Sequence, residues 1–172
     1  NTAIPEYLSH AFFIEGGALG VENALKVAFD WKVRKNMEKG KGEKGGKIIH
    51  FKHAFHGRTG YTLSLTNTSD PRKTMYFPKF DWPRIDIPKL SFPITDIVLQ
   101  EVEKNERIAI DQIKTALANN KDDVAALIIE PIQGEGGDNH FRDEFFVALR
   151  QLCDENEMLF IMDEVQTGIG IT

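Results

Sequence analysis

The chain has 172 residues and a formal net charge of −5 at pH 7; 41% of its residues are hydrophobic and 27% are charged. This composition is typical of a globular protein with a hydrophobic core, whereas a dedicated nucleic-acid-binding protein would normally be basic. The single cysteine, Cys153, excludes an internal disulfide and a cysteine-rich zinc site, and it favours a cytoplasmic location. No apolar run approaches the roughly 20 residues of a membrane span, so we expect no membrane partner.

The first part of the chain predicts a strand, a helix and a second strand. Residues 11–14 are apolar and predict a short buried strand, whereas residues 21–37 carry apolar side chains near helical spacing. The glycine-rich, charged segment 38–47 ends this helix and is typical of a solvated, flexible loop. The sequence KIIHF at 47–51 predicts the second strand.

The middle of the chain predicts coil and then a helix. Four prolines in the aromatic segment 76–93 forbid a long helix or a central strand, so we expect ordered coil held by aromatic packing. Thr95 or Asp96 is a suitable cap for a helix that runs to about Asn119.

The last part of the chain predicts a strand–helix–strand unit. The apolar run at 123–131 and the run at 158–162 predict strands. Residues 142–156 between them predict a helix, whose apolar face consists of Phe145, Leu149, Leu152 and Cys153. Continuous apolarity indicates that both faces of the strands are covered, as in a parallel sheet. We therefore expect an α/β fold, a three-layer αβα arrangement with a mostly parallel sheet.

Carboxylates follow these last two strands. Glu130 follows the first apolar run, and Asp163 and Glu164 follow the second. Because ligands of open α/β sheets bind beyond the carboxyl ends of the strands, these residues are candidates for chemistry. An apolar run before Asp-Glu also occurs in ATPases, but those need a phosphate loop of the form G-x-x-x-x-G-K-[ST]. The nearest segment, GEKGGKI, has the wrong glycine spacing and Ile48 in place of the hydroxyl residue.

Three further motifs are suited to binding small molecules. EGGALGVENALK (15–26) places a glycine turn before a helix, whose first N–H groups can hold a phosphate. HAFHGRTG (53–60) offers Arg58 for a bidentate contact with a carboxylate. The two histidines of this motif lack a third metal ligand at a suitable spacing, so we expect no metal site. IIEPIQGEGG (128–137) places Glu135 in a glycine-rich loop, and the spacing leaves open whether its charge is solvated or reserved for a partner.

The order of these motifs along the chain resembles the class III aminotransferases, which are fold-type I enzymes that use pyridoxal 5′-phosphate (PLP). The resemblance is carried by GGALGVENALK, AFHGRTGYTLSLT, EPIQGEGG and MDEVQTGIG, and it extends over essentially all 172 residues. Three segments are most similar in sequence to the lysine 6-transaminase branch of the class: EGGALGVENALKVAFDWK, FPKFDWPRI and GDNHFRDEFF.

The resemblance implies roles for individual residues in cofactor binding. Asp163 would pair with the pyridine nitrogen of PLP, and Gln166 would lie near its phenolic oxygen. Phe55 matches the aromatic residue that stacks on the ring, while Gly17 and Ala18 would give backbone N–H groups to the phosphate. Many members of the class have a Ser-Gly-Thr turn at this point, and its absence leaves phosphate binding to backbone groups and to residues elsewhere.

Other matches concern the substrates. Arg58 resembles the residue that grips the substrate carboxylate in the lysine and ornithine branches. Glu135 matches the switch glutamate, which would hold a distant arginine when the amino donor is bound and release it for 2-oxoglutarate. Glu130 would support the site from a strand end.

The resemblance also implies an activity, the transfer of the terminal (ε) amino group of L-lysine to 2-oxoglutarate in a homodimer, giving 2-aminoadipate semialdehyde and glutamate. The Schiff-base lysine and the C-terminal small domain of the family would lie beyond Thr172, so we expect residues 1–172 to be an inactive fragment of the large PLP-binding domain. Other ω-aminotransferases, which act on ornithine or 4-aminobutyrate, share the same motifs. A non-catalytic paralogue that keeps the fold is a further alternative, although it would have no need for Asp163, Gln166 and Phe55 together.

Overall fold

The computed structural model describes residues 7–169, and its centre is a four-stranded sheet with the strand order β2-β1-β3-β6. The strands are β1 (Lys47–Phe51), β2 (Arg84–Ile85), β3 (Val124–Ile129) and β6 (Leu159–Met162). Each neighbouring pair in this sheet is parallel. A separate antiparallel pair, β4 (Ile132–Gln133) and β5 (Asn139–His140), follows β3.

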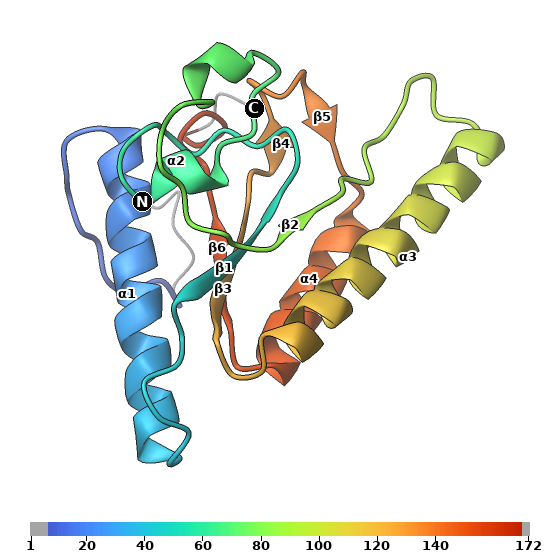
Figure 1. The fold of residues 1–172 in the computed structure, drawn as a ribbon. Helices are drawn as coiled ribbons and strands as arrows, with labels where there is room; N and C mark the ends of the chain where they lie inside the picture. The colour runs from blue at the N-terminus through green and yellow to red at the C-terminus, as the bar shows by residue number, and fades with distance from the viewer. Residues whose placement is uncertain (1–6, 170–172) are drawn as a thin grey trace.

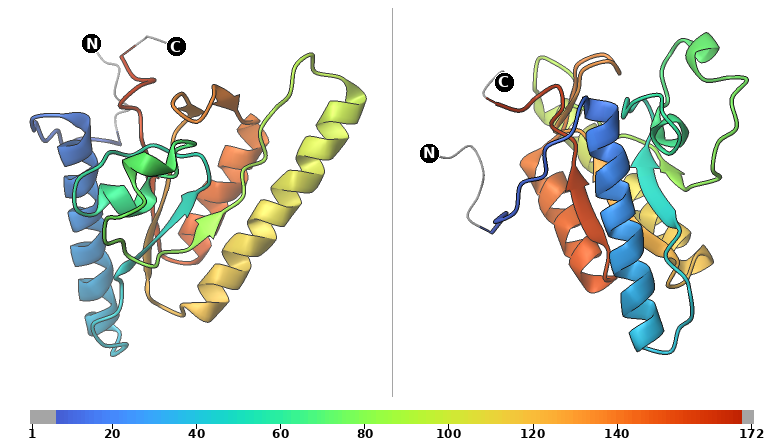
Figure 2. Two further views of the ribbon diagram at one scale, coloured as in Figure 1. Left: turned by 45° about the horizontal axis from the view of Figure 1, so that its top comes forward. Right: turned by 90° about the vertical axis from the view of Figure 1, so that its left-hand side faces the viewer.

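Three long helices cover the two faces of the sheet (Figure 1). α1 (Gly17–Glu38) lies on one face, and α3 (Asp96–Asn119) and α4 (Asp143–Glu155) lie on the other. The tilted view on the left of Figure 2 separates the same layers. This arrangement confirms the predicted three-layer αβα fold with a mostly parallel sheet.

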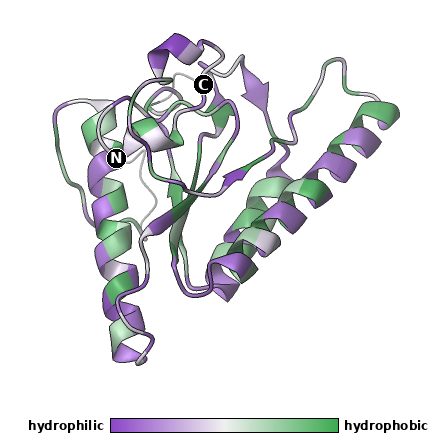
Figure 3. Ribbon diagram, in the orientation of Figure 1, coloured by the Kyte–Doolittle hydropathy of each residue, from purple (hydrophilic) through white to green (hydrophobic). Residues whose placement is uncertain are grey.

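The central strand, β3, is buried at all six of its residues. Its side chains divide between two hydrophobic clusters. Leu127 and Ile129 pack with the residues of α3 and α4, whereas Ala126 and Ile128 pack with those of α1. A strand that is covered on both faces is continuously apolar rather than alternating. The helices carry both hydrophobic and hydrophilic stretches in Figure 3, as expected for one buried and one exposed face.

Two of the predicted helices are confirmed, α3 with its predicted N-terminal cap and α4 with its predicted apolar face. α3 begins after Thr95, whose hydroxyl oxygen accepts a hydrogen bond from the Val98 N–H at 3.3 Å. The buried residues of α4 are those predicted for its apolar face, Phe145, Leu149, Leu152 and Cys153. The helix predicted over 21–37 is also present, but it begins earlier, at Gly17.

The strand predicted for residues 11–14 is wrong. No strand precedes α1 in the described part of the chain, and Phe12 and Phe13 are 73% and 92% exposed. A strand needs a neighbour to pair its backbone N–H and C=O groups. Within residues 7–169, no strand pairs with this segment, so its apolar sequence is an insufficient signal.

The glycine-rich segment 38–47 is tied to the protein more closely than a flexible loop would be. The N–H groups of Gly45 and Gly46 both donate to Asp123 Oδ1, at 2.8 and 3.1 Å. Asn36 Nδ2 donates to the carbonyl oxygens of Lys44 and Asp122, at 2.8 and 2.7 Å. The segment is largely exposed at 39–44, as predicted, and its end is attached to the turn before β3 by the hydrogen bonds to Asp123.

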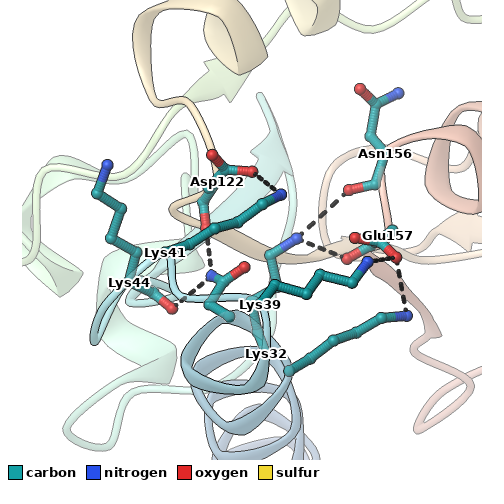
Figure 4. Close-up of polar contacts among 9 residues, drawn as sticks. Lys32, Lys39, Lys41, Lys44, Asp122, Asn156 and Glu157 are labelled. Atoms are coloured by element: carbon teal, nitrogen blue, oxygen red, sulfur yellow. Dashed lines mark hydrogen bonds and ion pairs between the residues drawn. The ribbon is translucent and has the colours of Figure 1, made fainter.

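A cluster of charged residues lies at the same end of the sheet (Figure 4). Lys32 is only 3% exposed, and its Nζ donates to the Glu157 carbonyl oxygen at 2.8 Å. The Glu157 carboxylate pairs with Lys39 at 2.5 Å, and the Asp122 carboxylate pairs with Lys41 at 2.6 Å. Glu157 and Asp122 have φ angles of 52° and 66°, a region that residues other than glycine rarely adopt. These contacts hold the turns that lead into β6 and β3.

Segment 76–93 is mostly coil packed by aromatic side chains, as predicted. The rings of Phe80 and Trp82 stack with their centroids 5.0 Å apart, and Trp82 Nε1 donates to the Gly46 carbonyl oxygen at 3.0 Å. The exception is β2, a short strand at the edge of the sheet next to β1. Pro83 directly before β2 is compatible with this edge position.

The short elements are not predicted by the sequence periodicity. They are α2 (Thr62–Leu65), the 3₁₀ turn at Pro71–Lys73 and the β4–β5 pair. Elements of this length contain too few positions for a strand or helix period to be recognised. None of the helices in the described residues is long and apolar enough to cross a membrane.

Leu149→Ala in α4 should lower the free energy of unfolding by about 2–5 kcal/mol, because removal of a buried leucine side chain leaves a cavity. Leu149 is 0% exposed, whereas Val147 on the same helix is 67% exposed. Val147→Ala is the matched control and should change the free energy of unfolding by less than about 0.5 kcal/mol. Urea unfolding of the intact protein measures both variants. Equal effects would contradict the assigned faces of α4.

Candidate active site

The carboxyl ends of β3 and β6 bring two carboxylates to one edge of the sheet. Glu130 directly follows β3 and Asp163 directly follows β6, and the last residues of these strands, Ile129 and Met162, are paired. The Asp163 N–H also donates to the Ile129 carbonyl oxygen at 2.9 Å. Glu130 and Asp163 are 5% and 7% exposed, whereas Glu164 is exposed. The predicted group of strand-end carboxylates therefore consists of two buried residues and one exposed residue.

The side chain of Asp163 is held by two hydrogen bonds. Its Oδ2 lies 2.7 Å from His56 Nδ1, and its Oδ1 accepts from the Val165 N–H at 3.1 Å. The side chains of His56 and Asp163 are 0% and 4% exposed, so water does not reach the pair. The other ring nitrogen, His56 Nε2, is buried and has no hydrogen-bond partner among the described residues.

In the sequence, His56 stands out only together with His53, as an incomplete metal site. His53 is exposed, and its backbone N–H donates to Asn67 Oδ1 at 2.9 Å. Within residues 7–169, no group of three His, Cys, Asp or Glu side chains is placed to hold a metal ion. His56 could have been identified as a site residue from its position in the loop after β1, because this loop lies at the same sheet edge as Asp163.

The carboxyl group of Glu130 is strongly affected by its surroundings. Burial raises the pKa of Glu130 to about 7, and the charges of Asp163 and Glu135 add to this effect, whereas His56 and the Phe55 N–H oppose it. The Phe55 N–H donates to Glu130 Oε1 at 2.9 Å. Glu130 therefore joins β3 to the loop after β1 and carries a proton below neutral pH.

The amino end of α1 meets the loops that follow β1 and β6. Gly16 is the N-cap residue, with φ 84°, and no side chain caps the first N–H groups. A Cβ on Gly17 would lie 2.4 Å from Val165 Cγ1, and a Cβ on Gly57 would lie 2.7 Å from Ala18 Cβ. The glycines thus allow both loops to pack directly against the start of the helix. The uncapped N–H groups and the positive end of the helix dipole are suited to an anion.

A buried carboxylate attaches the loop after β1 to α1. Glu22 is 7% exposed, and its Oε1 accepts hydrogen bonds from the Thr59 hydroxyl at 2.6 Å and the Tyr61 N–H at 2.8 Å. This role was not predicted, because a glutamate on a helix resembles a surface residue in sequence. The attached loop presents Phe55, which is half-buried, and Arg58, which is exposed. Within the described residues, the Arg58 guanidinium has no hydrogen-bond or ion-pair partner.

The β4–β5 loop meets the segment after β6. Gln166 is exposed, and its side-chain amide packs on Gly134, where a Cβ would lie 2.3 Å from Gln166 Oε1. In the same loop, Glu135 pairs with Lys73 at 2.5 Å, and both side chains are 38% exposed. The sequence predicted an arginine partner for Glu135 elsewhere in the protein, whereas here a lysine of the 3₁₀ turn balances its charge.

The structure thus brings the five predicted cofactor residues to one sheet edge, two at the start of α1 and three on loops. These residues are Gly17, Ala18, Phe55, Asp163 and Gln166. Arg58 lies on the loop that carries Phe55, and Glu135 lies on the β4–β5 loop; both residues are exposed. The edge therefore combines an uncapped helix start, a buried carboxyl group, an aromatic ring and an exposed arginine.

The chain belongs to the class III aminotransferases, since the sequence profile of the family Aminotransferase class-III matches residues 1–172. It is 54% identical to the L-lysine-epsilon aminotransferase of Mycobacterium tuberculosis over 166 residues, which are 96% of this chain and 36% of the relative. It is 44% identical to the 4-aminobutyrate aminotransferase of Schizosaccharomyces pombe over 125 residues, which are 73% of this chain and 26% of the relative.

A solved structure agrees with this membership. The lysine aminotransferase from M. tuberculosis, in its internal aldimine form, matches with a TM-score of 0.89 and 54% identity, over 94% of this chain and 36% of that chain. The fold is therefore that of the fold-type I aminotransferases. The chain spans about a third of the length of the lysine aminotransferases that it matches, 36% in each comparison.

Glu130→Gln should stabilise the protein at pH 8 and leave it nearly unchanged at pH 4.5. The folded-state pKa of Glu130, about 7, lies above the ordinary value of 4.5, so the stability that its neutral form provides is lost as the pH rises through 7. The gain at pH 8 should approach about 3 kcal/mol, since one pK unit corresponds to about 1.4 kcal/mol. Urea unfolding at both pH values measures it.

Glu164→Gln provides the control, because Glu164 is an exposed carboxylate at the same sheet edge. This variant should differ from the unsubstituted protein by less than about 0.5 kcal/mol at either pH. If Glu130→Gln stabilised the protein equally at both pH values, ionisation of Glu130 would not be the cause.

Proposed function

We propose that the intact protein containing this chain is a PLP-dependent aminotransferase that transfers the ε-amino group of L-lysine to 2-oxoglutarate. Its products would be 2-aminoadipate semialdehyde and glutamate. The observation that carries this proposal is the buried Asp163 carboxylate, which lies 2.7 Å from His56 Nδ1 and at the same sheet edge as the uncapped start of α1. The choice of lysine as donor is supported by the 54% identity to an L-lysine-epsilon aminotransferase.

The residues present fit both charged ends of PLP. The phosphate would bind the first N–H groups of α1, at Gly17 and Ala18, where no side chain caps the helix. The pyridine nitrogen would pair with Asp163, whose carboxylate is already oriented by two hydrogen bonds. Phe55 would stack on the ring, and Gln166 would lie near the phenolic oxygen. When bound, PLP supplies an electron sink for the carbanion that forms when the substrate loses a proton.

Asp163 would hold a proton on the ring nitrogen. Opposite charges about 4 Å apart attract each other by roughly 4 kcal/mol at an effective dielectric constant near 20. This attraction corresponds to about three pK units, which keeps the nitrogen protonated at neutral pH. Because the Asp163 side chain is only 4% exposed, water and salt screen the interaction weakly.

The substrate carboxylates would be bound by cations at the rim of the site. Arg58 has an exposed guanidinium without a partner in the described residues, and it would make a bidentate contact with the lysine α-carboxylate. Glu135 would neutralise a cation while the amino donor is bound and free it for the second carboxylate of 2-oxoglutarate. Its pairing with Lys73 at 2.5 Å, with both side chains 38% exposed, shows that the Glu135 carboxylate is accessible to a cation. The Schiff-base lysine and the arginine partner stay predictions for positions outside residues 1–172.

Other donors fit the same motifs. The 44% identity to a 4-aminobutyrate aminotransferase favours that substrate as the second candidate, with ornithine as a third. Because active sites in this family are shared across a dimer, we also propose a homodimer. A cytoplasmic location is proposed from the low cysteine content.

Gly57→Ala should weaken PLP binding more than Gly137→Ala. Both glycines have a positive φ, +113° and +110°, so the backbone strain of the two substitutions is similar. Only the Cβ at position 57 would meet another residue, Ala18 Cβ at 2.7 Å, whereas position 137 has open space. Overpacking of this kind costs about 1–3 kcal/mol, which corresponds to a roughly 5- to 150-fold loss of affinity. Quenching of protein fluorescence by PLP measures it, and equal losses in the two variants would assign the effect to strain alone.

The donor is tested by the visible spectrum of the bound cofactor in the intact protein. L-lysine should change this spectrum, and 2-oxoglutarate should restore it. Ornithine is one methylene shorter than lysine and should react at least about 10-fold more slowly, the usual discrimination for one methylene. A spectrum that responds only to ornithine or 4-aminobutyrate would contradict lysine as the donor and identify that compound as the donor instead. Absence of any cofactor spectrum would contradict a PLP-dependent activity and favour the non-catalytic paralogue.

A further inference from the structure

The loop that carries Arg58 is attached to α1 on both sides of this residue. On one side, a Cβ on Gly57 would lie 2.7 Å from Ala18 Cβ, so the backbone of Gly57 lies directly against the start of the helix. On the other side, Glu22 Oε1 accepts a hydrogen bond from the Thr59 hydroxyl at 2.6 Å. Arg58 itself is exposed. The backbone on both sides of Arg58 is thus held, while its side chain is accessible to a ligand.

A single carboxylate oxygen makes most of the second attachment. Glu22 Oε1 also accepts hydrogen bonds from the N–H groups of Tyr61 at 2.8 Å and Thr62 at 3.3 Å. Because Glu22 is 7% exposed, water competes weakly for these hydrogen bonds. Thr62 is the first residue of α2, which contacts α1 (Figure 1). One side chain of α1 therefore fixes the chain from Thr59 into α2.

The residues before Arg58 are held by different contacts. The His56 N–H donates to Thr66 Oγ1 at 3.0 Å, and the Thr66 hydroxyl donates to the Gly57 carbonyl oxygen at 2.6 Å. Neither contact involves Glu22. Loss of the Glu22 side chain should therefore release the residues after Arg58 and leave those before it in place.

The orientation of Arg58 matters because of how a guanidinium binds a carboxylate. The bidentate contact consists of two parallel N–H···O bonds, which form in one relative orientation of the two planar groups. A loop that is already held in the binding conformation loses less entropy when the ligand arrives, and this difference appears as affinity. The attachment at Glu22 supplies such preorganisation without touching the ligand.

We infer that Glu22 is a positioning residue for the amino donor: it holds the backbone after Arg58 so that the guanidinium meets an α-carboxylate, and it thereby makes the site select donors that carry this group. The inference rests on the proposed function in one respect, that Arg58 binds the α-carboxylate of the donor.

Two donors that differ only in this carboxylate test the selection. L-lysine and 1,5-diaminopentane have the same terminal amine, and 1,5-diaminopentane lacks the α-carboxylate. Without 2-oxoglutarate, each donor is titrated against the visible spectrum of the cofactor in the intact protein. Glu22→Ala should raise the half-saturating concentration of lysine about 10-fold and that of 1,5-diaminopentane less than about 3-fold. The maximal rate with lysine should change less than about 3-fold, because the carboxylate is remote from the reacting amine.

Three further variants separate positioning from a general effect on the fold. Glu22→Gln keeps an acceptor oxygen and should bind lysine within about 3-fold of the unsubstituted protein. Thr59→Val removes one donor with little change of shape and should weaken lysine binding in the same selective way as Glu22→Ala. Glu38→Ala removes an exposed glutamate at the end of α1 and is the control. Equal weakening of both donors in Glu22→Ala and Thr59→Val would indicate a general structural role and overturn the inference, as would unchanged lysine binding.

Hydrogen exchange of the intact protein without PLP measures the attachment itself. Peptides that cover residues 59–65 should exchange faster in Glu22→Ala than in Glu22→Gln or Glu38→Ala, whereas residues 53–57 should exchange equally in all three. Unchanged exchange at 59–65 would overturn the inference. If the unsubstituted protein does not bind PLP or does not respond to lysine, the proposed function fails, and the exchange rates still decide whether Glu22 holds the loop.

Discussion

The central strand β3 is the constraint on which the rest of this structure depends. It pairs with β1 on one side and β6 on the other, and all six of its residues are buried. Helices must therefore cover both faces of the sheet, which α1 does on one side and α3 and α4 do on the other. Because the three strands are parallel, their carboxyl ends lie at one edge and bring Glu130, Asp163 and the loop with His56 together. The burial of apolar side chains thus decides where the polar site is built.

The two edges of the sheet use charge in different ways. At the amino edge, Lys39 and Lys41 pair with the carboxylates of Glu157 and Asp122, and these side chains are 20–44% exposed. Such pairs contribute little free energy each and are weakened by salt. At the carboxyl edge the Asp163 side chain is 4% exposed, and its partners in the described part of the chain are the His56 ring and a backbone N–H rather than a lysine or arginine. The ion pairs of the first edge stabilise turns, whereas at the second edge Asp163 has no lysine or arginine partner within residues 7–169.

Long periodic patterns made most of the fold predictable from the sequence. β3, α3 and α4 each have enough positions for a period to be recognised, and Thr95 marks the start of α3. The strand predicted for residues 11–14 failed because a strand also depends on a neighbour, which local sequence does not specify. The hairpin β4–β5 is too short to give a pattern at all.

Only those site residues that belong to a family motif could be predicted from the sequence. Family motifs placed Asp163 and Phe55 on loops that the structure brings together. The contact of His56 with Asp163 joins residues 107 positions apart, and the hydrogen bonds of Glu22 to Thr59 and Tyr61 also span long separations. The raised pKa of Glu130 arises from burial by the assembled fold. These features are properties of tertiary contacts, so no local pattern reports them.

The uncapped start of α1 has a consequence for how such a site responds to acidity. Gly16 and Gly17 offer only main-chain groups to an anion, and a main-chain N–H neither gains nor loses a proton in the physiological range. In a site built on lysine or histidine side chains, the affinity for phosphate would depend on the ionisation of those side chains. The contribution of these N–H groups to binding an anion would stay constant while Glu130, at the same sheet edge, changes its charge near neutrality. A change of pH would thus alter the stability of the fold and the charge of the ligand's phosphate, but not the N–H groups at the start of α1.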